Sequence, residues 1–172
     1  MGPICGYAGE QSREKVEIML SASRYRGAKK LWQNQGIAIG QVSPELELQL
    51  SIACDGRFYG EDMKFLEKAD HIAIKEILPK VNGDYALAIA GEEKILLARD
   101  PIGARALYYG FDRDGKEFAF ASEKAMLRAI AREDIRSLPP GSILTCGEKR
   151  EELNFREKIF QQGEKLIEDE TQ

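Results

Sequence analysis

The stretch between residues 85 and 121 constrains the fold most strongly. It contains four short apolar segments, residues 85–90, 94–98, 106–111 and 117–121, separated by turn sequences rich in Gly, Pro and Asp. Such short connections allow only antiparallel pairing of neighbouring strands, because a parallel pair needs a crossover of a dozen or more residues. This region therefore predicts an antiparallel sheet.

Further strands and several helices are expected around this sheet. Apolar or alternating patterns predict strands at residues 4–8, 36–42, 46–53 and 141–146. Helical spacing covers residues 12–26, 61–68, 70–78 and 122–132, with Ser12, Asp70 and Ser122 as the expected N-caps. Mostly antiparallel strands flanked by helices predict an α+β fold, a four-layer αββα sandwich of two mainly antiparallel sheets between helical layers.

Composition excludes several classes of protein. At 172 residues, with 43% hydrophobic and 31% charged residues, the chain suits one globular domain. A net charge of -4 without a clustered Lys/Arg stripe argues against nucleic acid as a partner. No apolar run approaches the roughly 20 residues that span a bilayer, so we expect no membrane insertion and a cytoplasmic protein.

The three cysteines, Cys5, Cys54 and Cys146, are too widely spaced for a metal site or a disulfide framework. We therefore expect reduced thiols, no metal and no cofactor. Cys5 differs from the other two because it lies near the start of the chain and precedes Gly6. A cysteine that becomes the first residue can use its own α-amine, of pKa about 7.7 to 8, as the base. The alternative is a small buried core residue.

Six segments resemble, in order, the motifs of class II glutamine amidotransferases, in particular the N-terminal glutaminase domain of asparagine synthetases. They are residues 5–9 (Cys-Gly-Tyr-Ala-Gly), 25–27, 83–88, 97–109, 120–125 and 138–142. The resemblance implies an N-terminal nucleophile hydrolase fold over residues 5–147. Residues 1–4 are then a leader or propeptide-like extension, and residues 148–172 a polar tail or docking segment.

The resemblance also implies a reaction. In this family the cysteine thiol attacks the side-chain amide of glutamine, releases ammonia and leaves a glutamyl thioester that water hydrolyses. Cys5 occupies the position of that nucleophile. The only histidine, His71, is not needed as a base and is interpreted as an ordinary surface or packing residue.

This chain departs from the family pattern beside the expected nucleophile. Four residues precede Cys5, so its α-amine is free only after cleavage behind Ile4. Asp55, Gly56 and Arg57 align with the Asn-Gly-Glu triplet, whose Asn amide and Gly N–H form the oxyanion hole of the family. An ionised aspartate only accepts hydrogen bonds and would repel an oxyanion. The alternative interpretation of Asp55 and Gly56 is a tight turn between a strand and a helix.

Substrate recognition also differs from the family. Residues 40–44 read Gly-Gln-Val-Ser-Pro where the family has Gly-His-x-Arg-Leu, so the arginine that holds the substrate carboxylate is missing. Arg57 is a candidate replacement. Asp70 aligns with the acidic residue that holds the substrate amine, and its alternative role is the N-cap of a helix.

We therefore expect a glutaminase-type domain with Cys5, Gly56 and Asp55 in catalysis and with Asp70 and Arg57 in binding of glutamine. The ammonia would pass to a separate ATP-dependent synthetase subunit like that of asparagine biosynthesis. Two alternatives stay open: a catalytically impaired homologue that serves as a regulatory or interaction module, and a thiol amidohydrolase with a different substrate. The sequence does not fix the oligomeric state, and a homo-oligomer is compatible with it.

Overall fold

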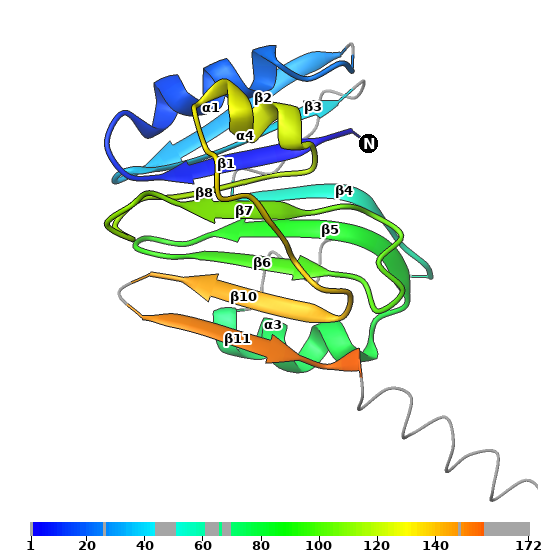
Figure 1. Cartoon of the computed structure of the whole chain (residues 1–172). Coiled ribbons are helices and arrows are strands. Elements are labelled where there is room, and N and C mark those ends of the chain that lie inside the picture. The colour runs from blue at the N-terminus through cyan, green and yellow to red at the C-terminus, as the bar shows by residue number, and fades with distance from the viewer. Residues whose placement is uncertain are drawn as a thin grey trace, which may run out of the picture.

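Two antiparallel sheets form the body of the protein (Figure 1). The structure, a computed structural model, describes residues 2–25, 27–43, 51–60, 66, 70–147 and 149–156. The first sheet has the strand order β2-β3-β1-β8-β7-β9. Its strands are β1 Ile4–Ala8, β2 Ala28–Asn34, β3 Ile37–Ser43, β7 Tyr108–Phe111, β8 Phe118–Ala121 and β9 Arg136–Ser137.

The second sheet has the order β11-β10-β6-β5-β4. Its strands are β4 Ile52–Phe58, β5 Gly83–Ala90, β6 Ile95–Arg99, β10 Ser142–Cys146 and β11 Arg150–Asn154. Every strand pairing among the described residues is antiparallel, as the short connections predicted. The predicted antiparallel fold class is confirmed.

Helices cover the outer faces of the two sheets (Figure 1). Helices α1 Ser12–Ser21 and α4 Lys124–Ala129 pack on the first sheet, and α3 His71–Ile77, continued by the 3-10 helix η1 Leu78–Lys80, packs on the second. Ile4, Ala53, Leu97 and Phe120 belong to the core between the sheets. Because side chains alternate along a strand, Cys5 faces α1 and α4 instead.

Two of the three expected helix caps are wrong. Ser12 lies inside α1, and the residue at the N-cap is Gln11, in a left-handed conformation with no side-chain capping bond. Glu123 precedes α4, while the hydroxyl of Ser122 accepts a hydrogen bond from the N–H of Ile4 at 3.0 Å. Asp70 does cap α3, because its carboxylate accepts from the N–H groups of Ile72 and Ala73.

One strand extends beyond its predicted range, and another was not predicted. β4 continues through Asp55 and Gly56, which pair with Ala86 and Tyr85 of β5, so the tight turn considered for them is not formed. β11 lies within the segment expected to be a polar tail, and the buried Phe155 follows it. The helix expected at residues 61–68 and the first part of the strand expected at 46–53 lie mostly outside the described residues.

The buried Asp100 gives the 97–109 motif a structural role, because it fixes the conformation of a loop. Asp100 is fully buried, and its Oδ1 accepts from the N–H groups of three consecutive residues, at 3.0, 2.7 and 3.1 Å. Its Oδ2 accepts from the N–H of Arg105 at 3.3 Å. The Arg99 guanidinium holds the same loop through the carbonyls of Gly103 and Arg105. Together these bonds fix the loop that carries the Arg105 side chain.

No helix in the described part of the chain is long and apolar enough to span a membrane.

We expect Asp100→Ala to lower the free energy of unfolding by about 3 kcal/mol or more, because it removes a buried carboxylate that accepts from four N–H groups of the loop. Urea denaturation followed by circular dichroism measures this loss. Asp112→Ala is the matched control, since the Asp112 carboxylate accepts one N–H, from Glu117, and is partly exposed. That change should cost about 1 kcal/mol or less. Equal losses in the two variants would contradict the role of Asp100.

Candidate active site

Cys5 lies inside the first sheet, between Gly40 of β3 and Ala121 of β8. Its side chain is 0% exposed and packs in the cluster that includes Val16 and Met126 of the covering helices. Burial raises the pKa of the Cys5 thiol far above its usual range. In this state the thiol is neutral, whereas attack on an amide requires the thiolate or a nearby base.

The residues in front of Cys5 continue strand β1. Gly2, Pro3 and Ile4 are all buried. The carbonyl of Ile4 accepts from the N–H of Ser122 at 2.9 Å, and the carbonyl of Pro3 accepts from the N–H of Val42 at 3.0 Å. The nitrogen of Cys5 is therefore a peptide nitrogen within a paired strand, not an amine.

Gln41 links this extension of β1 to the second sheet. Its Nε2 donates to the carbonyls of Gly2 and Cys54, at 3.2 and 2.7 Å, and its Oε1 accepts from the N–H of Cys54 at 3.3 Å. The side chain is only 2% exposed, so these bonds satisfy an amide that would otherwise be buried without partners. Gln41 thereby brings β4 beside the start of β1.

Asp55 of β4 reaches the same region. Its carboxylate lies 3.9 Å from Nη1 of Arg105. Burial raises the pKa of Asp55, and the positive charge of Arg105, together with the Ser122 side chain, opposes this effect. Ser122 is bonded to the Ile4 backbone through its hydroxyl and its own N–H, so β8 is tied to the peptide unit in front of Cys5.

Gly56 occupies a backbone position that only glycine fits. Its φ is +126°, and a Cβ on it would lie 1.9 Å from the carbonyl oxygen of Asp84. The strand pair β4–β5 thus closes tightly at this point. The backbone conformation and the close approach of β5 therefore explain why residue 56 is a glycine. This explanation does not depend on whether the Gly56 N–H group is used in catalysis.

A cluster of charged side chains lies beyond Gly56. Nε and Nη2 of Arg105 donate to Oδ2 of Asp84, at 3.0 and 2.8 Å, and the hydroxyl of Tyr59 donates to its Oδ1 at 2.7 Å. Arg57 lies further away, with its Nε 3.6 Å from Oδ1 of Asp84 and its side chain 68% exposed. The hydrogen bond from Tyr59, followed by those from Arg105, lowers the pKa of Asp84.

Asp70 lies apart from these residues. Its carboxylate caps α3 on the outer face of the second sheet. Among the described residues, no hydrogen bond or ion pair joins Asp70 to Cys5, Asp55 or Arg57. Of the predicted site residues, the structure brings together the segment around Cys5 with Asp55 and Gly56, with Arg57 at its edge.

Several contacts in this region were not anticipated. Ser122, Gln41, Arg105 and Asp84 connect strands that are far apart in the sequence, and the Ile4–Ser122 bond spans 118 residues. The available signals were the motifs at residues 83–88, 97–109 and 120–125, which contain Asp84, Arg105 and Ser122, but they did not indicate which partners these side chains contact.

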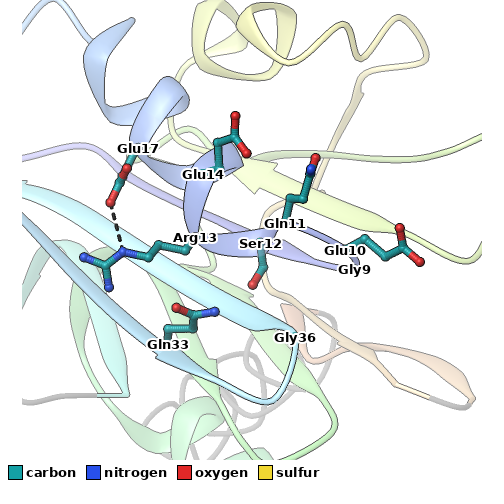
Figure 2. A pocket seen from close by; sticks show the side chains of 9 residues that line it. All are labelled: Gly9, Glu10, Gln11, Ser12, Arg13, Glu14, Glu17, Gln33 and Gly36. Carbon is teal, nitrogen blue, oxygen red and sulfur yellow. Dashed lines mark hydrogen bonds and ion pairs between the residues drawn. The ribbon is translucent and has the colours of Figure 1, made fainter.

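Three cavities among the described residues lie elsewhere. Figure 2 shows one at the start of α1, where Ser12 and Gln33 lie at the wall and Arg13 pairs with Glu17 at 3.0 Å. The second includes His71, and the third includes Gly36 and Gly115. None of these three is lined by Cys5. In the described part of the chain, no group of three or more His, Cys, Asp or Glu side chains could hold a metal ion.

Asp55 and Asp84 should affect stability with opposite signs. A raised pKa in the folded state means that ionised Asp55 opposes folding; this penalty fades as the pH falls through the folded-state pKa and is gone below the unfolded value of about 3.9. A lowered pKa means that ionised Asp84 favours folding above that value and that this contribution is lost as the pH falls through the folded-state pKa.

We therefore expect Asp55→Asn to raise Tm at pH 7 and Asp84→Asn to lower it, by a few °C each. The difference for Asp55→Asn should shrink as the pH falls towards 4, whereas the difference for Asp84→Asn should persist to about pH 4 and shrink only below it. Thermal denaturation between about pH 3 and 7 measures both. A loss of stability in both variants at pH 7 would mean that the interaction of Asp55 with Arg105 outweighs its burial.

Comparison with known proteins identifies the family. A family described as a glutamine amidotransferase domain matches residues 38–129. A Methanocaldococcus jannaschii protein that carries the name asparagine synthetase (glutamine-hydrolyzing) 1 is 31% identical over an alignment of 144 residues, which covers 74% of this chain and 24% of that protein. The amidophosphoribosyltransferase of Bacillus subtilis is 26% identical over 147 residues, 83% of this chain and 30% of that enzyme.

The structural comparison supports the same fold. The glutamine phosphoribosylpyrophosphate amidotransferase from B. subtilis, solved in complex with ADP and GMP, superposes with a TM-score of 0.74 at 17% identity. The superposition covers 89% of this chain and 49% of that one. This chain spans between about a quarter and a third of the length of the two curated relatives. By its sequence match over more than half its length and by its two-sheet architecture, the chain belongs to the family of class II glutamine amidotransferase domains.

Proposed function

We propose that this domain hydrolyses the side-chain amide of glutamine and that a separate, asparagine-synthetase-like subunit uses the ammonia. The observation that carries the proposal is the meeting of β1, β4 and the end of β8: Ser122 accepts from the Ile4 amide, and the Gln41 side chain donates to the carbonyls of Gly2 and Cys54, next to Asp55. The name of the M. jannaschii relative, a glutamine-hydrolyzing synthetase, supports the choice of substrate and of partner.

Cleavage of the Ile4–Cys5 peptide bond would be the activating step. It would free the α-amine of Cys5 one residue beyond the Ile4–Ser122 contact. With a pKa of about 7.7 to 8, this amine would accept the thiol proton as the sulfur attacks the amide carbon. The amide nitrogen would leave as ammonia after taking up a proton, and water would then hydrolyse the thioester to glutamate and the free thiol.

Gly56 and Asp55 would stabilise the oxyanion. The Gly56 N–H is one donor in this proposal. Burial favours the neutral acid of Asp55, which carries one O–H that can donate, whereas the ionised form can only accept. Arg105, 3.9 Å away, favours the ionised form. We therefore expect the proposed glutaminase to be slower than one with an amide at position 55.

Arg57 and Asp70 would bind the substrate. Arg57 is exposed and is held only loosely by Asp84, so its guanidinium is available to a carboxylate. The assignment of Asp70 to the substrate amine rests on the order of motifs, and its carboxylate would have to release the N–H groups of Ile72 and Ala73 to serve in this way. The segment from residue 148 onwards is the proposed contact with the synthetase subunit.

A second candidate function is that of a catalytically impaired homologue, which serves as a regulatory or interaction module. The observation that favours it is the paired strand in front of Cys5: the residues there are buried and hydrogen-bonded, and the thiol is 0% exposed. Ser43 stands where the family has its carboxylate-binding arginine, which weakens substrate binding in either case.

Intact mass and N-terminal sequencing should distinguish the two candidates. A protein that begins at Cys5 should release ammonia from glutamine, and Cys5→Ala should reduce this rate by about 10⁴-fold or more, because it removes the nucleophile. Cys54→Ala is the matched control, since Cys54 is also a buried cysteine and should leave the rate within about threefold. Equal rates for the Cys5→Ala variant and the wild type would exclude the glutaminase.

We expect Asp55→Asn to raise the glutaminase rate of the same Cys5-initiated protein by about tenfold or more, because a single oxyanion donor is worth roughly 10²- to 10³-fold. The measurement is kcat for ammonia release at pH 8, where the carboxylate is most fully ionised. Asp84→Asn serves as control, because it also removes a carboxylate that Arg105 contacts. A rate unchanged by Asp55→Asn would mean that position 55 does not face the oxyanion.

A further inference from the structure

Residues 2–4 prolong strand β1 at the edge where Cys5 lies (Figure 1). They lie between β3 on one side and Ser122, which directly follows β8, on the other. All three residues are buried, and Ile4 is 0% exposed within the core between the sheets. We call the position that they fill the β1 slot.

Strand β3 holds this segment on one side of the β1 slot. The N–H of Val42 donates to the carbonyl of Pro3 at 3.0 Å. The Nε2 of Gln41 donates to the carbonyl of Gly2 at 3.2 Å. Both bonds recognise backbone carbonyls, so they would serve any extended segment in the same place.

Ser122 holds the segment on the other side. Its N–H donates to the carbonyl of Ile4 at 2.9 Å, and its hydroxyl accepts from the N–H of Ile4 at 3.0 Å. The β1 slot therefore binds a backbone from both sides, as strand addition to a sheet does. The carbonyl that Ser122 contacts belongs to the Ile4–Cys5 peptide bond.

The side chains of residues 2–4 match the β1 slot. A Cβ on Gly2 would lie 2.2 Å from the carbonyl oxygen of Val42, so only glycine fits there without a shift of the backbone. Pro3 has no N–H and brings no donor that the slot must satisfy. Ile4 places an aliphatic side chain in the core between the sheets. The slot thus selects a sequence as well as a backbone.

We propose that residues 2–4 are a built-in inhibitor of the candidate active site, and that the vacated β1 slot binds an extended peptide ending in an aliphatic residue. This inference rests on the cleavage behind Ile4 that the proposed function requires. Hydrolysis adds water across the Ile4–Cys5 peptide bond and leaves a carboxylate on Ile4 and an amine on Cys5.

Cleavage then has two effects. In the uncut chain the segment occupies its slot at the high effective concentration of a tethered ligand. After hydrolysis it is a short peptide that dissociates on dilution. Cutting one bond therefore opens the slot beside Cys5 and also frees the α-amine.

The probe is acetyl-Gly-Pro-Ile, which reproduces residues 2–4 with the new carboxylate. Added to the Cys5-initiated protein, it should raise Tm in a saturable manner, with half-saturation at about 1 mM or below. If the Cys5-initiated protein does not fold alone, the same peptide should fold it, because a ligand of the native state shifts the folding equilibrium. The uncut chain should not respond, since its slot is filled.

Acetyl-Ala-Pro-Ile is the matched control peptide. Its extra methyl group meets the Val42 carbonyl, so it should bind about tenfold more weakly or worse. Ser122→Ala removes one acceptor and should weaken acetyl-Gly-Pro-Ile about fivefold. Ser21→Ala is the control variant, because Ser21 is exposed at the end of α1, and it should change the affinity less than about twofold.

The uncut chain offers an independent measurement. Gly2→Ala should speed hydrogen exchange at the N–H groups of Val42 and Ser122 by about tenfold or more, because the displaced segment no longer accepts from them. The paired amides of β5 and β6 in the other sheet should keep their protection.

Where the Cys5-initiated protein releases ammonia, acetyl-Gly-Pro-Ile should raise the apparent KM for glutamine and leave kcat unchanged, because peptide and substrate compete. Three results would overturn the inference: no change in Tm or folding with peptide up to about 20 mM, equal effects of the Gly and Ala peptides, or a bound peptide that leaves KM unchanged. Peptide binding without ammonia release would support the β1 slot and count against the glutaminase.

Discussion

The buried amide of Gln41 holds the two sheets together at the edge where the chain enters the fold. Its three hydrogen bonds tie the carbonyl of Gly2 to the backbone of Cys54, one residue before Asp55. Apolar contacts between the sheets supply most of the adhesion, but they are not directional. A buried amide with defined partners sets the register of β1 against β4, and the position of every group near Cys5 depends on that register.

The same edge explains why the motifs of the family survive while the groups around the thiol differ. Asp100 and Arg99 organise the loop that delivers Arg105, and Gly56 allows β4 and β5 to approach closely. The main role of these residues is therefore to stabilise the fold. Positions 43 and 55 lie on β3 and β4, outside the loop that Asp100 and Arg99 organise.

The sequence predicted the fold class because the period of the apolar residues and the short turns leave few arrangements open. It did not predict the edge strand β2. Lys29 and its neighbours in this strand do not show a clear alternation of buried and exposed residues. The turn considered as the alternative for Asp55 and Gly56 is not formed, because pairing with β5 overrides the local preference of these two residues. The contacts of Ser122 could not be predicted, since its partners lie more than 60 residues away and only the tertiary fold brings them close.

The backbone at Gly56 also limits how this site can evolve. With a φ of +126° and no room for a Cβ, position 56 is closed to every other amino acid, so variation at this end of β4 can only enter through the side chains on either side. Codons for aspartate and asparagine differ by a single base. A single point mutation can therefore exchange aspartate and asparagine at position 55, and no third residue has to occupy the position on the way.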